Sequence, residues 1–139
     1  VSDLAQADAM TRDVAFIFSE MPDAPHGDLD TIFSEMSERA GSMIEESVAA
    51  FVNSDVARAR EVIAADDAVD GLYDRAEAVI VELIRDGEPS PHSLPELLMV
   101  AKYFERIGDK AQHVADWTFF RATGERILSG GDHAAPSEA

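Results

Sequence analysis

Residues 93–123 read SLPELLMVAKYFERIGDKAQHVADWTFFRAT, and this stretch is the strongest indication of the fold class. Apolar and small residues recur in it at intervals of three and four, the spacing of one face of an α-helix. Ser93 and Glu96 form a capping box at its start, and Gly124 follows its end. The stretch therefore predicts one amphipathic helix roughly 45 Å long. Its apolar face consists of Leu97, Ala101, Phe104, Gly108, Ala111 and Ala115.

The same helical spacing extends upstream, interrupted only where proline and glycine cluster. It predicts helices over 2–20, 28–52 and 55–86, with no strand. Because long helices joined by short breaks pack as antiparallel neighbours, we expect an all-α, up-down helical bundle. The small and polar residues 129–139 are expected to form a flexible tail.

Composition limits the partners that this chain can have. Its 139 residues correspond to one domain, and 28 acidic against 11 basic residues give a net charge of −17. A surface this negative repels nucleic acids and anionic lipids. The chain contains no Cys, and it shows neither a signal peptide nor an apolar run long enough to insert into a membrane.

Motifs for covalent or acid–base catalysis are absent from the sequence. It has no phosphate-binding glycine loop, no Gly-x-Ser-x-Gly and no His-Glu-x-x-His. Glu-x-x-His, which a ferritin-like di-iron bundle needs, is missing as well. We therefore expect no enzymatic activity.

Acidic residues form a ladder on the last two helices. Asp66, Asp70 and Asp74 follow one another at steps of four, and so do Glu105, Asp109 and His113. Asp70 lies 16 residues before Asp86, where the first of these helices ends, and Asp109 lies 16 residues after Ser93, where the next begins. The hairpin thus places Asp70 level with Asp109. By the same count, Asp66 meets His113 and Asp74 meets Glu105, with the acids beside the core seam rather than inside it.

Two interpretations of this ladder remain open. Carboxylate oxygens at matched heights suit a divalent or trivalent ion such as Mg, Mn, Ca or Fe, and a histidine would extend the choice to Zn. A solvated acidic face is the alternative, because one residue in five is acidic and such pairs then arise by chance.

Two stretches resemble the PhoU family. Residues 98–116, LMVAKYFERIGDKAQHVAD, are similar to its signature helix, Ala-x-x-x-Glu-Arg-x-Gly-Asp-x-Ala-x-Asn-x-Ala-Glu. Residues 59–74, AREVIAADDAVDGLYD, resemble its preceding helix. The resemblance implies a PhoU-like three-helix repeat over 28–128, with an additional N-terminal helix and linker over 1–27. One alignment with the family makes 1–27 the end of a degenerate first repeat.

The resemblance also implies a function. PhoU proteins are cytoplasmic regulators that connect a phosphate ABC transporter to a sensor histidine kinase, and we expect this chain to be a homodimer of that kind. Some members bind metal on paired Glu/Asp-x-x-x-Asp motifs. These motifs correspond here to Asp66 with Asp70 and to Glu105 with Asp109, so these four are the predicted metal ligands, with Asp74 and His113 as lesser candidates.

The sequence departs from the family pattern at several positions. His113 replaces the asparagine, Asp116 replaces the closing glutamate, and Ala5 and Ala9 stand where a first repeat would carry acids. Two alternatives to the regulator therefore stay open: a PhoU-like domain of a larger transporter or transcriptional regulator, and a carboxylate-bridged metal-binding bundle.

Overall fold

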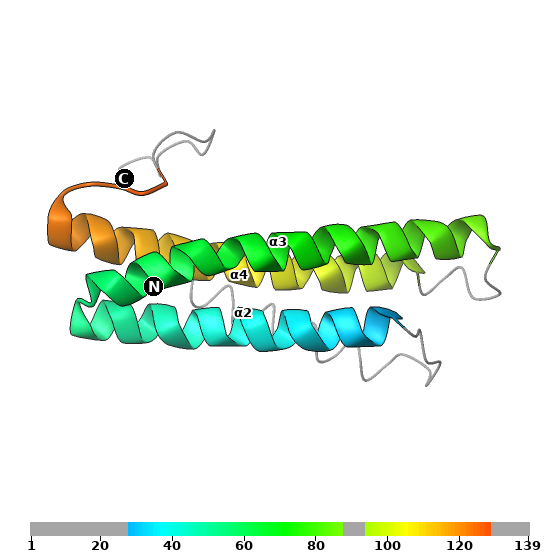
Figure 1. The fold of residues 1–139 in the computed structure, drawn as a ribbon, viewed down its shortest axis with the longest axis horizontal. Coiled ribbons are helices and arrows are strands. Elements are labelled where there is room, and N and C mark those ends of the chain that lie inside the picture. The colour runs from blue at the N-terminus through cyan, green and yellow to red at the C-terminus, as the bar shows by residue number, and fades with distance from the viewer. Residues whose placement is uncertain (1–27, 88–93, 129–139) are drawn as a thin grey trace.

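Three antiparallel helices form the fold of the computed structural model, which describes residues 28–87 and 94–128. They are α2 (Asp28–Asn53), α3 (Val56–Arg85) and α4 (Leu94–Thr123), and each contacts both others along its length (Figure 1). The described residues form no strand. The predicted all-α bundle and three of its helices are confirmed. The predicted helix over 2–20, the Ser93 cap and the tail lie outside the described residues.

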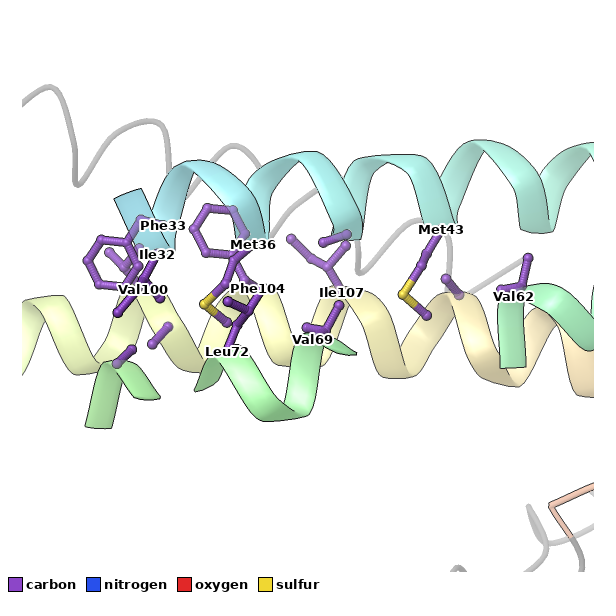
Figure 2. Packing of buried hydrophobic residues seen from close by; sticks show 14 of the residues in the cluster. Ile32, Phe33, Met36, Met43, Val62, Val69, Leu72, Val100, Phe104 and Ile107 are labelled. Carbon is purple, nitrogen blue, oxygen red and sulfur yellow. The ribbon is translucent and has the colours of Figure 1, made fainter. Parts of the chain in front are cut away.

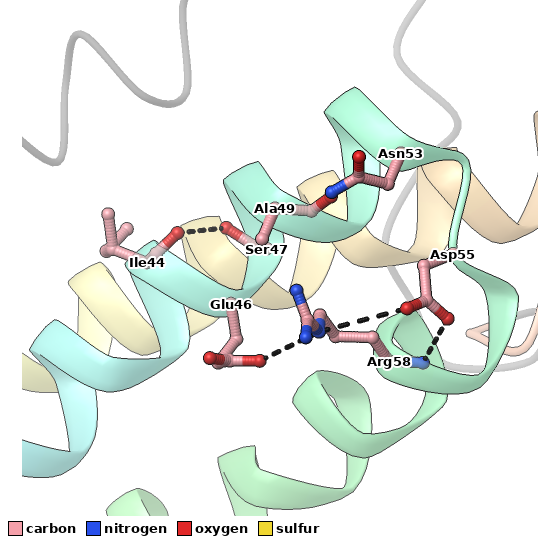
Figure 3. Close-up of polar contacts among 7 residues, drawn as sticks. All are labelled: Ile44, Glu46, Ser47, Ala49, Asn53, Asp55 and Arg58. Atoms are coloured by element: carbon pink, nitrogen blue, oxygen red, sulfur yellow. Dashed lines mark hydrogen bonds and ion pairs between the residues drawn. The ribbon is translucent and has the colours of Figure 1, made fainter.

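The junction of α2 and α3 is a tight reversal fixed by two residues. Ser54 adopts a positive φ of 52°, which breaks the helix. Asp55 then caps α3, because its carboxylate accepts a hydrogen bond from the backbone N–H of Arg58 at 3.1 Å. The Arg58 side chain reaches back to Glu46 of α2 at 3.1 Å, which closes the turn from both sides (Figure 3).

One continuous apolar core runs along the bundle axis. Large side chains from α2, among them Ile32, Phe33 and Met36, point toward α3 and α4 (Figure 2). Phe33 packs on Phe104 with ring centroids 6.5 Å apart. Burying such side chains stabilises a fold by about 1.5–3 kcal/mol each, so this seam holds the three helices in register.

The segment after α4 is tied back onto the helix by a buried acid. Gly124 turns the chain at φ 79°, and Asp116, only 6% exposed, accepts hydrogen bonds from the backbone N–H groups of Ile127 and Leu128 at 2.9 and 3.3 Å. Arg126 lies over the Trp117 ring, 5.9 Å from its centroid. Asp116, in the position of the family's closing glutamate, thus has a structural role here.

Candidate metal centre

Three of the predicted ligands lie together between α3 and α4. Asp66, Asp70 and Asp109 each offer a carboxylate oxygen, and these oxygens lie within 4.8 Å of one another. We call these three residues the acidic triad. Asp66 and Asp70 follow one another by a helical turn on α3, and Asp109 faces them from α4, as the hairpin count predicts for Asp70.

Asp66 is buried, contrary to the expectation that the acids stay beside the core. Its exposed fraction is 4%, and within the described ranges its Oδ1 has no hydrogen-bond partner. An unsatisfied buried polar atom lowers the free energy of unfolding by about 1–3 kcal/mol, and by more when the group is charged. Asp70 and Asp109 are only partly buried, so the triad opens from the core toward the surface.

Gly108 explains how a carboxylate fits at this depth. A Cβ at position 108 would lie 3.1 Å from Oδ1 of Asp66, 3.5 Å from Cγ1 of Val69 and 3.6 Å from Sδ of Met43. Contacts of 3.1 Å are too tight for an unshifted carboxylate, so glycine leaves the space that Asp66 occupies. The sequence indicated only that a small residue lets a helix approach, and it did not reveal the Asp66 contact.

Burial and mutual repulsion disfavour charge in the triad. Burial, and then the negative charges of Asp109 and Asp70, raise the pKa of Asp66 to about 8. For Asp70, burial followed by the charges of Asp109 and Glu105 raises the pKa to about 6. At neutral pH the site therefore favours a bound positive charge, either a proton or a cation.

The other predicted ligands stand outside the triad. Glu105 acts on Asp70 through its charge, but its own carboxylate accepts a hydrogen bond from Nζ of Lys102 at 3.0 Å. Asp74 is exposed and likewise acts on Asp70 through its charge. His113, partly buried on α4, is not part of the group that the triad forms. The residue that sequence reasoning missed is Lys102, although its spacing of three from Glu105 is typical of helical ion pairs.

A hydrogen bond between the helices fixes the depth of the triad. Nε2 of Gln112 donates to the backbone carbonyl of Ile63 at 3.2 Å, linking α4 to α3 one turn from Asp66. Ile63 is itself part of the buried core, so this part of α3 has both apolar packing and a hydrogen bond to α4. The carboxylates of the triad are consequently carried on rigid helices rather than on loops.

The geometry defines a three-helix bundle with a carboxylate triad that is buried at Asp66 and opens toward the surface at Asp70 and Asp109. The model of the PhoU domain matches residues 33–118, which include all of the triad. The chain therefore belongs to the PhoU domain family.

Named relatives agree with this assignment. The phosphate-specific transport system accessory protein PhoU homolog of Clostridium acetobutylicum is 30% identical over 127 residues, covering 91% of this chain and 58% of the relative. A second such homolog, from Methanothermobacter thermautotrophicus, is 33% identical over 107 residues, covering 77% of this chain and 47% of the relative. The chain thus spans about half the length of these relatives. No solved structure matches it significantly.

Within residues 28–87 and 94–128, no helix combines sufficient length with sufficient hydropathy to cross a bilayer.

Proposed function

We propose that this chain is a non-enzymatic accessory component of phosphate uptake that regulates phosphate-starvation signalling in the cytoplasm through protein contacts. The single observation that carries this proposal is the match of residues 33–118 to the PhoU domain. The names of the relatives, which are accessory proteins of phosphate-specific transport, support it. The partners we propose are components of a phosphate ABC transporter and a sensor histidine kinase, contacted by a homodimer.

Charge provides the proposed means of recognition. Exposed acids follow α3, where Asp74, Glu77 and Glu82, together with one basic residue, line a shallow depression. The other lining residues are Ala78, Val81 and Arg85. A basic partner surface would associate rapidly with such a strip, and salt would weaken the complex.

Binding of the purified chain to the transporter ATPase subunit and to the kinase, both from the same organism, tests this function. We expect affinity to fall at least about fivefold between 50 and 300 mM salt, and further in Glu77→Gln/Glu82→Gln. Glu35→Gln is the matched control, because Glu35 is an exposed acid on α2 paired with Arg39. Failure of both partners to bind at low salt would contradict the proposed contacts.

We further propose that the acidic triad, with Glu105 as a fourth ligand, holds a divalent or trivalent metal ion such as Fe, Zn, Mg or Mn. The unsatisfied Oδ1 of buried Asp66 supports this, since carboxylate oxygen is the donor that hard cations prefer. When bound, the ion would offset the repulsion within the triad and hold α3 to α4. Metal analysis of the protein beside an Asp70→Ala/Asp109→Ala double variant tests the site, and equal metal content in both would refute it.

A further inference from the structure

Lys102 binds Glu105, the predicted fourth ligand, on α4. Its Nζ is 3.0 Å from Oε1 of Glu105, one helical turn further along α4. The Glu105 side chain is 17% exposed, whereas that of Lys102 is 43% exposed. The ammonium group therefore reaches inward from the surface to a largely buried carboxylate.

A second contact, from the other helix, fixes the position of Lys102. Its Nζ lies 5.2 Å from the centroid of the Tyr73 ring on α3, within the range of a cation–π interaction. Tyr73 follows Asp70 by three residues, so the ring stands one turn from the triad. Lys102 is thus held between α3 and α4 at the height of Glu105, and its position does not depend on one surface ion pair alone.

Glu105 is placed to act on the triad, although its carboxylate is engaged elsewhere. Its charge contributes to the raised pKa of Asp70, and Glu105 lies one helical turn before Asp109 on α4. A metal ion that used Oε1 of Glu105 as a ligand would have to displace the Lys102 ammonium from it, and one that used Oε2 would meet a carboxylate whose charge Lys102 already offsets. The same positive charge also repels a cation that approaches Glu105.

We infer that Lys102 is an internal competitor for the metal: by occupying Glu105, it limits the site to the three aspartates and weakens cation binding until Glu105 is released. This inference rests on the proposed metal site and adds to it the residue that sets its affinity. It identifies two states of the centre, a three-carboxylate state with Lys102 on Glu105 and a four-carboxylate state with the pair broken.

Mn²⁺ titration of the full chain by calorimetry, with elemental analysis of bound Mn per chain, tests this inference. We expect Lys102→Met to bind Mn²⁺ about tenfold more tightly than the unaltered chain, because a nearby positive charge is removed and a ligand is freed. Lys102→Arg, which keeps the charge, should bind like the unaltered chain. Arg39→Met is the matched control, since it removes the same charge from an exposed pair on α2 and should change affinity less than about twofold.

The Glu105→Gln background separates competition for the ligand from simple repulsion. There Lys102→Met should tighten binding by less than about threefold, because no fourth carboxylate can be released. An effect of Lys102→Met no larger than that of Arg39→Met, or one equally large in Glu105→Gln, would overturn the inference while leaving the metal site in place. Absence of Mn²⁺ binding in every variant, Lys102→Met included, would instead refute the metal site and the inference with it.

Discussion

Replacing Asp66 with asparagine should stabilise the metal-free protein at neutral pH and leave it nearly unchanged in mild acid. The pKa of Asp66 is raised from 3.8 to about 8, so between these values the folded state binds a proton that the unfolded state has released. The free energy of unfolding must then fall as pH rises through this window. Asparagine keeps the neutral shape at every pH and removes the effect.

The size of the effect follows from the width of the window. Each pH unit between the two pKa values changes the free energy of unfolding by about 1.4 kcal/mol, so Asp66 alone contributes at most about 4 kcal/mol between pH 4.5 and 7.5. Asp70, with its pKa raised to about 6, acts in the same direction up to that pH, and its part is smaller because it is partly exposed. Asp66→Asn should therefore be more stable than the unaltered chain by several kcal/mol at pH 7.5.

Urea unfolding followed by circular dichroism, with EDTA present, measures this difference at both pH values. Glu61→Gln is the matched control: Glu61 is an exposed acid on α3 whose charge is not among those that raise the pKa of Asp66 or Asp70, and its replacement should change stability by less than about 0.5 kcal/mol. Identical pH dependence in Asp66→Asn and the unaltered chain would show that burial does not disfavour the Asp66 charge. In a second arm without EDTA, Mn²⁺ should stabilise the unaltered chain at pH 7.5 and have little effect on Asp66→Asn.

Three further substitutions, the first with a matched control, test separate parts of the structure. Gly108→Ala should weaken Mn²⁺ binding about tenfold by displacing Asp66, while stability, measured in urea, changes by less than about 1 kcal/mol because the gain in helix propensity offsets the tight contact. The control is Gly41→Ala, whose added methyl group meets nothing within 4 Å; it should raise stability by up to about 1 kcal/mol and leave Mn²⁺ binding unchanged. Equal Mn²⁺ affinity in the Gly108→Ala and Gly41→Ala variants would contradict the idea that Gly108 leaves the space for Asp66. Asp116→Ala should cost about 1–3 kcal/mol and accelerate hydrogen exchange at the two amides that it binds, and unaltered exchange there would refute the tie. Met36→Ala should cost about 2–5 kcal/mol, since Met36 is fully buried in the core, and a urea midpoint like that of the unaltered chain would refute this.

The helices could be predicted closely because their signals are local. The ends of α2, α3 and α4 fall within about two residues of those expected from proline, glycine and capping residues. The height of Asp70 opposite Asp109 also followed, since a short turn between two long helices fixes their register. Local patterns determine how far along a helix a residue lies, and this was sufficient for that pair.

The side of the helix to which each acidic residue turns, and the neighbours it meets there, could not be predicted in the same way. The helical wheel placed the acids beside the core, yet Asp66 is buried because Gly108 on the facing helix leaves room for it. Height alone paired Asp66 with His113, whereas Asp109, one turn away, lies in the group with Asp66. The pairing of Glu105 with Lys102 depends in addition on the Tyr73 ring from α3. Each of these features requires knowledge of what the neighbouring helix presents.

Residues 66 and 108 are not the residues that core packing alone would favour, and they lie at the proposed functional site. An apolar residue at 66 and alanine at 108 would satisfy both helix propensity and packing, but the chain carries an unsatisfied carboxylate and a glycine there. Such a combination lowers stability at neutral pH unless a positive charge is supplied. Protons, the Lys102 ammonium beside Glu105 and a metal ion are three sources of that charge, and they compete for the same few carboxylates. If the proposed metal site is correct, the stability of the α3–α4 pair should therefore depend on cation supply as well as on pH.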